Sequence, residues 1–122
     1  MARILLIDDD DTFRDMLKDM IERNGYEVVS ASDGDEGMDL YRKEPTDLII
    51  TDIIMPNKEG VELIFEFQRD FPDAKIIAIS GGGKGNAKDY LNVASNISNV
   101  KHAFQKPFAM GDLIQAVKEI LG

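Results

Sequence analysis

Short apolar runs alternate along the chain with stretches whose apolar residues recur three and four positions apart. The apolar runs predict buried strands, because their hydrophobic residues are continuous rather than alternating. We expect five of them, at residues 3–7, 26–30, 48–52, 74–79 and 102–105. The spaced positions predict five amphipathic helices. They are marked by Phe13, Leu17, Met20 and Ile21; by Gly37, Met38, Leu40 and Tyr41; by Val61, Ile64, Phe65 and Gln68; by Tyr90, Leu91, Ala94 and Ile97; and by Leu113, Ala116, Val117 and Ile120.

This alternation predicts an α/β fold. Strand–helix–strand units join parallel strands by right-handed crossovers and cover both faces of the sheet with helices. We expect a three-layer α/β/α sandwich with a five-stranded parallel sheet in the flavodoxin-like order 2-1-3-4-5. The 122 residues suffice for one core and are too few for two, so residues 1–122 are expected to form one domain. Asp11 or Thr12 is expected to cap the first helix, which Asn24-Gly25 ends.

Composition excludes several kinds of site. The chain has no cysteine and one histidine, which rules out disulfides, thiolate metal sites and a multi-histidine metal site. The net charge of −9 argues against nonspecific binding of nucleic acid, whose phosphates it would repel. The longest apolar runs are strand-sized, so no membrane span is predicted. The N-terminal sequence lacks the features of a signal peptide, and we expect a cytoplasmic protein.

Polar residues stand at the carboxyl ends of four of the five predicted strands. Asp8-Asp9 follow the first strand, Asp52 ends the third, Ser80 follows the fourth and Lys106 follows the fifth. In an open parallel sheet those ends form one edge, and ligands bind in the crevice there. Because the first and third strands are neighbours in the expected order, their acids should meet at the point where the crossovers diverge.

Three carboxylates in one small cleft repel one another and must be protonated in part or share a cation. Oxygen ligands alone suit a hard ion, Mg²⁺ or Mn²⁺. Lys106 adds a positive charge and Ser80 a hydroxyl donor. A carboxylate nucleophile, a divalent ion, an ammonium and a hydroxyl are the groups needed for phosphoryl transfer to Asp52.

Each of these residues also has an ordinary structural explanation. The acids at 8–11 could be a solvated turn with a helix cap, Asp52 a turn former, and Ser80 and Lys106 surface residues. Their shared place at strand ends favours the functional interpretation. The lone His102 is expected to be a partly exposed strand residue, and the phenylalanines and methionines core residues. The glycine-rich segment 81–86 does not have the spacing of a phosphate-binding loop.

The motifs together resemble the response-regulator receiver domain of two-component signalling, in its single-domain, chemotaxis-regulator-like form. The resemblance spans the chain and rests on Asp8-Asp9, on Asp52 before Met55-Pro56 and Gly60, on Ser80, and on Lys106-Pro107-Phe108. It implies that Asp52 accepts a phosphoryl group from a sensor histidine kinase or a histidine phosphotransfer protein. It also implies an unknown downstream protein partner, docked through the fourth helix, fifth strand and last helix, or a place in a phosphorelay.

The same resemblance implies a ligand set and roles. Asp9, the Asp52 side chain and the backbone carbonyl of Ile54 would ligate Mg²⁺, and Asp8 would act through metal-bound water. Ser80 and Lys106 would contact phosphoryl oxygens, and the Lys106–Pro107 bond is expected to be cis. Such a protein is a phosphoacceptor that promotes its own phosphorylation and dephosphorylation, and is not an enzyme with a separate substrate.

Three departures from the family pattern carry hypotheses. Ala103 stands where the family has a switch aromatic, so the usual ring movement cannot operate. Ile54 cannot orient an attacking water, which predicts a long-lived phosphoryl group. The segment from Ser80 to Lys106 is longer than usual by about one helical turn, and we expect its glycine loop and the fourth helix to carry the signal.

Two other functions compete with this interpretation. A Mg²⁺-dependent aspartyl-phosphate phosphohydrolase would commonly carry a second aspartate where Ile54 stands, and would need a cap domain. A flavin-binding module on the same fold would have to place a phosphate against the acidic loop at residues 8–11, which would repel it.

Overall fold

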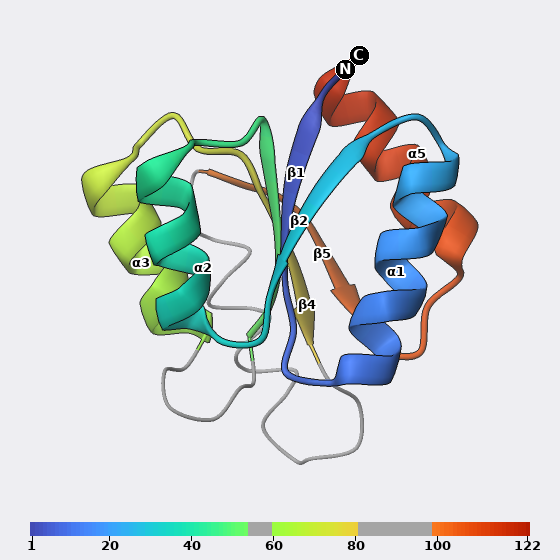
Figure 1. The fold of residues 1–122 in the computed structure, drawn as a ribbon, viewed down its shortest axis with the longest axis horizontal. Helices are drawn as coiled ribbons and strands as arrows, with labels where there is room; N and C mark the ends of the chain where they lie inside the picture. The colour runs from blue at the N-terminus through green and yellow to red at the C-terminus, as the bar shows by residue number, and fades with distance from the viewer. Residues whose placement is uncertain (54–59, 81–98) are drawn as a thin grey trace.

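The computed structural model describes residues 1–53, 60–80 and 99–122. Five strands and four helices lie in these ranges (Figure 1). Three expectations fall outside the described residues: the backbone carbonyl of Ile54, the glycine loop at 81–86 and the helix at 90–97. In chain order the elements are β1 (Arg3–Ile7), α1 (Asp11–Arg23), β2 (Glu27–Ala31), α2 (Gly34–Lys43), β3 (Leu48–Asp52), α3 (Gly60–Asp70), β4 (Ile76–Ser80), β5 (Val100–Gln105) and α5 (Met110–Leu121).

The five strands form one parallel sheet in the order β2-β1-β3-β4-β5, which confirms the predicted fold class. β1 and β3 lie next to each other, with Ile7 opposite Thr51. Asp52 is opposite Ile79 on β4. The acids that follow β1 and end β3 are therefore brought to one edge by the sheet register itself.

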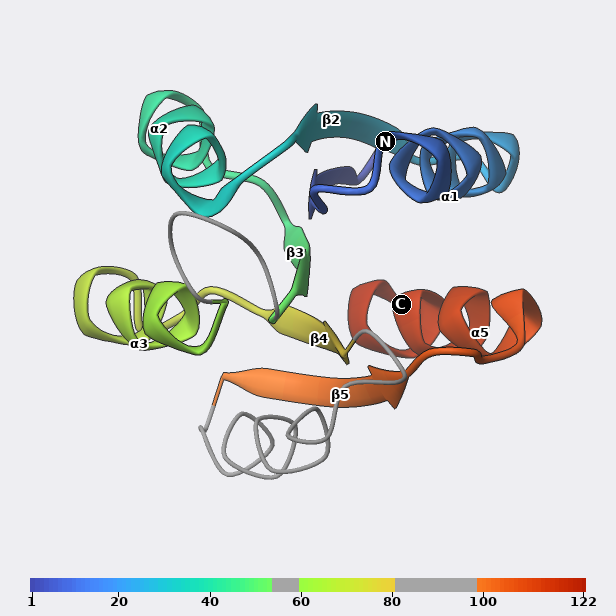
Figure 2. The same cartoon turned by 90° about the horizontal axis from the view of Figure 1, so that it is seen from below.

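Helices cover both faces of this sheet. α2 and α3 pack on one face, and α1 and α5 pack on the other (Figure 2). The strand residues alternate between the two layers, because successive side chains of a strand point to opposite faces. Leu5, Ile7 and Ile49 belong to the first core, whereas Ile4, Leu6 and Ile50 belong to the second. All five residues of β3 and of β4 are buried, as expected of central parallel strands.

Several predicted boundaries were wrong by one or two residues. The first helix is capped by Asp10, not by Asp11 or Thr12, since the Asp10 Oδ1 accepts a hydrogen bond of 3.1 Å from the Phe13 N–H. β4 begins at Ile76, because the Ala74 N–H donates to the Phe71 carbonyl and closes a turn there. β2 is displaced by one residue along the chain and β5 starts two residues earlier, where Val100 pairs with Ile76.

Three described apolar residues assigned to the core lie at the surface. Phe65 is 49% exposed, Met16 is 47% exposed and Met1 is 92% exposed. In α3 the core is instead filled by Leu63, Ile64 and Phe67. Phe65 adjoins Ile64 in sequence, and adjacent helix positions point about 100° apart, so one of the two leaves the buried stripe.

Both ends of the chain lie at the same side of the molecule. β1 runs from there toward the edge that carries Asp8, and α5 returns to it (Figure 1). Within the part of the chain that the structure describes, no helix combines the length and apolar character needed to cross a membrane.

Candidate functional site

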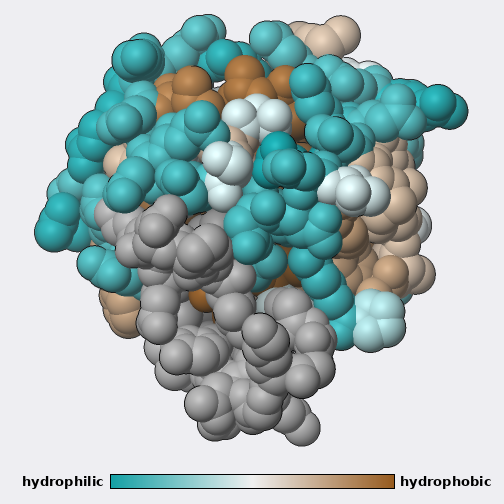
Figure 3. All heavy atoms as spheres, turned by 60° about the horizontal axis from the view of Figure 1, so that its bottom comes forward, coloured by the Kyte–Doolittle hydropathy of each residue, from teal (hydrophilic) through white to brown (hydrophobic). Residues whose placement is uncertain are grey.

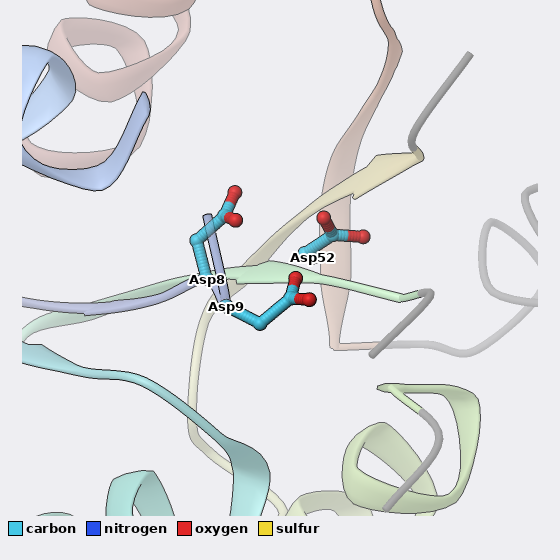
Figure 4. A group of neighbouring side chains, drawn as sticks. All are labelled: Asp8, Asp9 and Asp52. Atoms are coloured by element: carbon cyan, nitrogen blue, oxygen red, sulfur yellow. The ribbon is translucent and has the colours of Figure 1, made fainter. Parts of the chain in front are cut away.

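Three carboxylates meet at the carboxyl edge of the sheet. Asp8 and Asp9 directly follow β1, and Asp52 is the last residue of β3 (Figure 4). One carboxylate oxygen from each lies within 4.8 Å of the others. Asp8 is 1% exposed and Asp52 is 4% exposed, while Asp9 is open to solvent. The sequence-based prediction that these acids converge is therefore confirmed geometrically.

Backbone and side-chain hydrogen bonds hold the loop that carries Asp8. The Asp8 N–H donates to the Ala31 carbonyl at 3.1 Å, and the Asp10 N–H donates to Asp8 Oδ1 at 2.9 Å. Arg14, one turn into α1, donates from Nη1 to the Asp8 carbonyl at 2.7 Å and from Nη2 to Asp11 Oδ1 at 2.6 Å. Asp8 and Asp9 thus lie on a loop that the following helix, α1, holds in place.

Sequence reasoning overlooked Arg14. Its guanidinium reaches back across the first turn of α1, and its side chain is only 15% exposed. A cation three residues after Asp11 on a helix is a recognisable pairing signal. That spacing does not reveal the second bond, to a carbonyl of the preceding loop.

Lys106 reaches the acids from the end of β5. Its Nζ lies 3.3 Å from Asp8 Oδ2 and 3.4 Å from Asp52 Oδ2. The Lys106 N–H donates to the Ser80 carbonyl at 2.8 Å, which ties the ends of β4 and β5 together. The Lys106–Pro107 peptide bond is cis, as the resemblance implied. Ser80 is fully buried at the end of β4, the strand that pairs with β3.

Burial and charge act in opposite directions on the Asp8 carboxyl. Its burial raises the pKa, and the neighbouring Asp9 carboxylate acts in the same direction. The Asp10 N–H and the Lys106 ammonium partly offset this rise in the pKa. The acidic edge of the sheet therefore holds more negative charge than its one described ammonium balances, and a hard cation would relieve the excess.

His102 lies away from the acids. Its Nε2 is 3.4 Å from Glu119 Oε2 on α5, and its ring stacks on Phe104 at 6.2 Å. The side chain is 38% exposed, in line with the expectation of a partly exposed strand residue.

The described surface around the acidic edge is mostly hydrophilic, with a few apolar patches (Figure 3). Hydrophilic surroundings suit a site that exchanges a divalent ion and an anionic group with water.

Comparison with known proteins yields one family. Residues 4–118 match the model of the response regulator receiver domain. The response regulator receiver protein CpdR of Brucella abortus is 34% identical over 121 residues, covering 99% of this chain and 98% of the relative. The chemotaxis protein CheY of Thermotoga maritima is 36% identical over 114 residues, covering 85% of this chain and 95% of the relative.

Solved structures agree with these relatives. A response regulator receiver domain protein from Clostridium thermocellum superimposes with a TM-score of 0.89 at 28% identity, covering 99% of this chain and 94% of that one. The response regulator protein TrrA from Thermotoga maritima, in complex with Mg²⁺ and BeF, has a TM-score of 0.84 at 31% identity, covering 98% and 99%.

Proposed function

The chain belongs to the response regulator receiver domain family, and from that premise we propose that Asp52 is its phosphoacceptor. Members of this family are phosphorylation-controlled signalling switches of two-component systems. One observation carries the assignment: Asp52 lies within reach of both Asp8-Asp9 and Lys106 at the end of a central strand. Asp8 has the same neighbours, and the resemblance to the family assigns the phosphoryl group to Asp52 rather than to Asp8.

The chain's own groups supply the steps of the transfer. An Asp52 carboxylate oxygen donates an electron pair to the phosphorus of a phosphohistidine, the new P–O bond forms, and the P–N bond breaks with its electrons going to the imidazole. The Lys106 ammonium pairs with one phosphoryl oxygen and the Ser80 hydroxyl donates to another. Because this charge stabilisation is fixed in advance by the fold, the domain promotes its own phosphorylation.

The acids fit a hard divalent cation. The donor set consists of carboxylate oxygens within 4.8 Å of one another, without sulfur or imidazole. Asp9 and Asp52 would hold Mg²⁺ directly, Asp8 would contact its water, and the resemblance adds the carbonyl of Ile54. When bound, Mg²⁺ would neutralise phosphoryl charge. The Mg²⁺–BeF complex of TrrA supports this metal, and Mn²⁺ suits the same ligands.

The phosphodonor would be a sensor histidine kinase or a histidine phosphotransfer protein. The output would be docking of a downstream protein or onward transfer in a relay. We treat residues 1–122 as one receiver unit, since both cores extend along the whole sheet.

The dephosphorylation rate should be low. Ile54 offers no polar group to orient a water, and Ile54→Asn should therefore speed the loss of the phosphoryl group. The measurement is the decay of labelled protein after removal of the phosphodonor. Fast decay that Ile54→Asn leaves unchanged would count against this part of the proposal.

Exposure to acetyl phosphate with and without Mg²⁺, followed by mass spectrometry, tests the proposed function. We expect one phosphoryl group per chain, on Asp52, only with Mg²⁺. Asp52→Asn should abolish labelling, and the matched surface variant Asp15→Asn should retain it. Repeated release of phosphate per chain would instead favour the phosphohydrolase. The absence of both labelling and phosphate release would favour a flavin-binding module. The hydrolase is not favoured, because the acids match the receiver site.

A further inference from the structure

The Lys106 ammonium has a third described partner that is not an acid. Its Nζ lies 3.9 Å from the centroid of the Phe13 ring, over the face. The negative face of an aromatic ring attracts a cation at this distance, most strongly where water is partly excluded. The Lys106 side chain is 21% exposed, so the contact is shielded on most sides.

The other two described partners change when the site is used. Phosphorylation would convert the Asp52 carboxylate into an acyl phosphate, and a bound divalent ion would withdraw charge from Asp8 and its neighbours. The attraction between Lys106 and the Phe13 ring depends on neither event. The ring therefore still attracts the ammonium during phosphoryl transfer, when its attraction to the carboxylates is weakest.

Phe13 is itself fixed by both loops that form the site. Its N–H donates to the Asp10 cap at 3.1 Å, which sets its place in the first turn of α1. Its ring meets that of Phe108 edge to face, with centroids 6.2 Å apart and planes at 89°. Phe108 follows Lys106 by two residues. The lysine and the residue that packs against the Phe13 ring therefore belong to the same short segment.

We propose that Phe13 is a positioning residue for Lys106, whose ring face holds the ammonium over the cleft so that it meets the phosphoryl oxygen. This inference rests on the proposed phosphoacceptor function and adds a residue to it. A lysine side chain has a flexible four-carbon stem, and its conformational freedom would otherwise have to be lost during the transfer. The ring does that ordering before the phosphodonor arrives.

Fluorination of the ring separates this role from packing. Mono-, di- and trifluorophenylalanine placed at position 13 weaken the negative face in steps while barely changing the size of the ring. We expect the logarithm of the rate of Asp52 labelling by acetyl phosphate to fall linearly with the number of fluorine atoms. With three fluorines the rate should be reduced about fivefold. In a Lys106→Met background, which lacks the cation, the melting temperature should not change with the number of fluorine atoms.

Phe71 provides a matched control. It also lies beneath a cation, with the Arg42 guanidinium 5.2 Å from its centroid, but it packs on the α2–α3 face. The same fluorine series at Phe71 should leave the labelling rate unchanged. A flat series at Phe13, or equal slopes at both positions, would overturn the positioning role. Absence of labelling in the unsubstituted protein would instead overturn the proposed function, so the two failures are distinguishable.

Discussion

Replacing Asp52 by asparagine should stabilise the metal-free protein, because the fold confines more negative charge than it balances. The carboxylate oxygens of Asp8, Asp9 and Asp52 lie within 4.8 Å of one another. At an effective dielectric constant of about 20, each such pair repels by at least ~3.5 kcal/mol at the 4.8 Å limit. The Lys106 ammonium, 3.4 Å from Asp52, attracts the Asp52 carboxylate by ~5 kcal/mol at the same dielectric constant.

Among these four charged groups, the balance for Asp52 is therefore a repulsion of about 2 kcal/mol. Exposure of Asp9 screens part of it, while burial of Asp52 at 4% exposure adds a desolvation penalty in the same direction. We expect Asp52→Asn to raise the free energy of unfolding by about 1 kcal/mol, or the melting temperature by roughly 4 °C in a domain of this size.

Thermal and urea unfolding at neutral pH in excess chelator measures this gain. Asp15→Asn, on the exposed face of α1, removes the same charge from the total without touching the cleft. It should change the melting temperature far less than Asp52→Asn does. An Asp52→Asn variant that melts at or below the unsubstituted protein in chelator would refute the electrostatic reasoning.

Three further outcomes are expected. Mg²⁺ should raise the melting temperature of the unsubstituted protein, by the equivalent of about 2.7 kcal/mol at a hundred times its Kd, and Asp9→Asn should remove most of this rise. Gly37→Ala should lower the free energy of unfolding, measured in urea, by about 1–3 kcal/mol, because the added Cβ would lie 2.7 Å from Ile7 Cγ1. In the control variant Gly111→Ala the added Cβ meets nothing within 4 Å, and the substitution should be neutral or stabilising. Hydrogen bonds from Arg69 and Arg42 lower the pKa of Asp70 in the folded protein. The small stability deficit of Asp70→Asn at neutral pH should therefore shrink as the pH falls below about 4, where the carboxyl of the unfolded chain takes up a proton, and should vanish once the folded carboxyl is protonated too. A deficit that persists in strong acid would contradict this.

The sheet and its acidic edge could be predicted because both depend on local patterns. Continuous apolar runs indicate buried strands, and alternation with helices fixes a parallel order, so Asp8, Asp9 and Asp52 converge by topology alone. Lys106 followed in the same way from its place after β5.

What sequence reasoning missed depends on side-chain direction. Asp10, Asp11 and Thr12 are all acceptable caps, and only the backbone angles at the start of α1 decide among them. The Arg14 bond to the Asp8 carbonyl crosses a turn, and the Phe13 ring beneath Lys106 joins two segments that are far apart in the chain. Sequence spacing gives the side-chain orientation in neither case. Phe65 was misplaced because hydrophobicity alone does not say which of two adjacent apolar residues faces the sheet.

The common location of the two chain ends, remote from the acids, has a practical consequence. A fluorescent reporter or an immobilisation tag attached at Met1 or Gly122 would project from the side of the molecule opposite the acidic edge of the sheet. Surface-coupled protein could therefore be presented to a phosphodonor in a defined orientation, with every molecule offering the same accessible end.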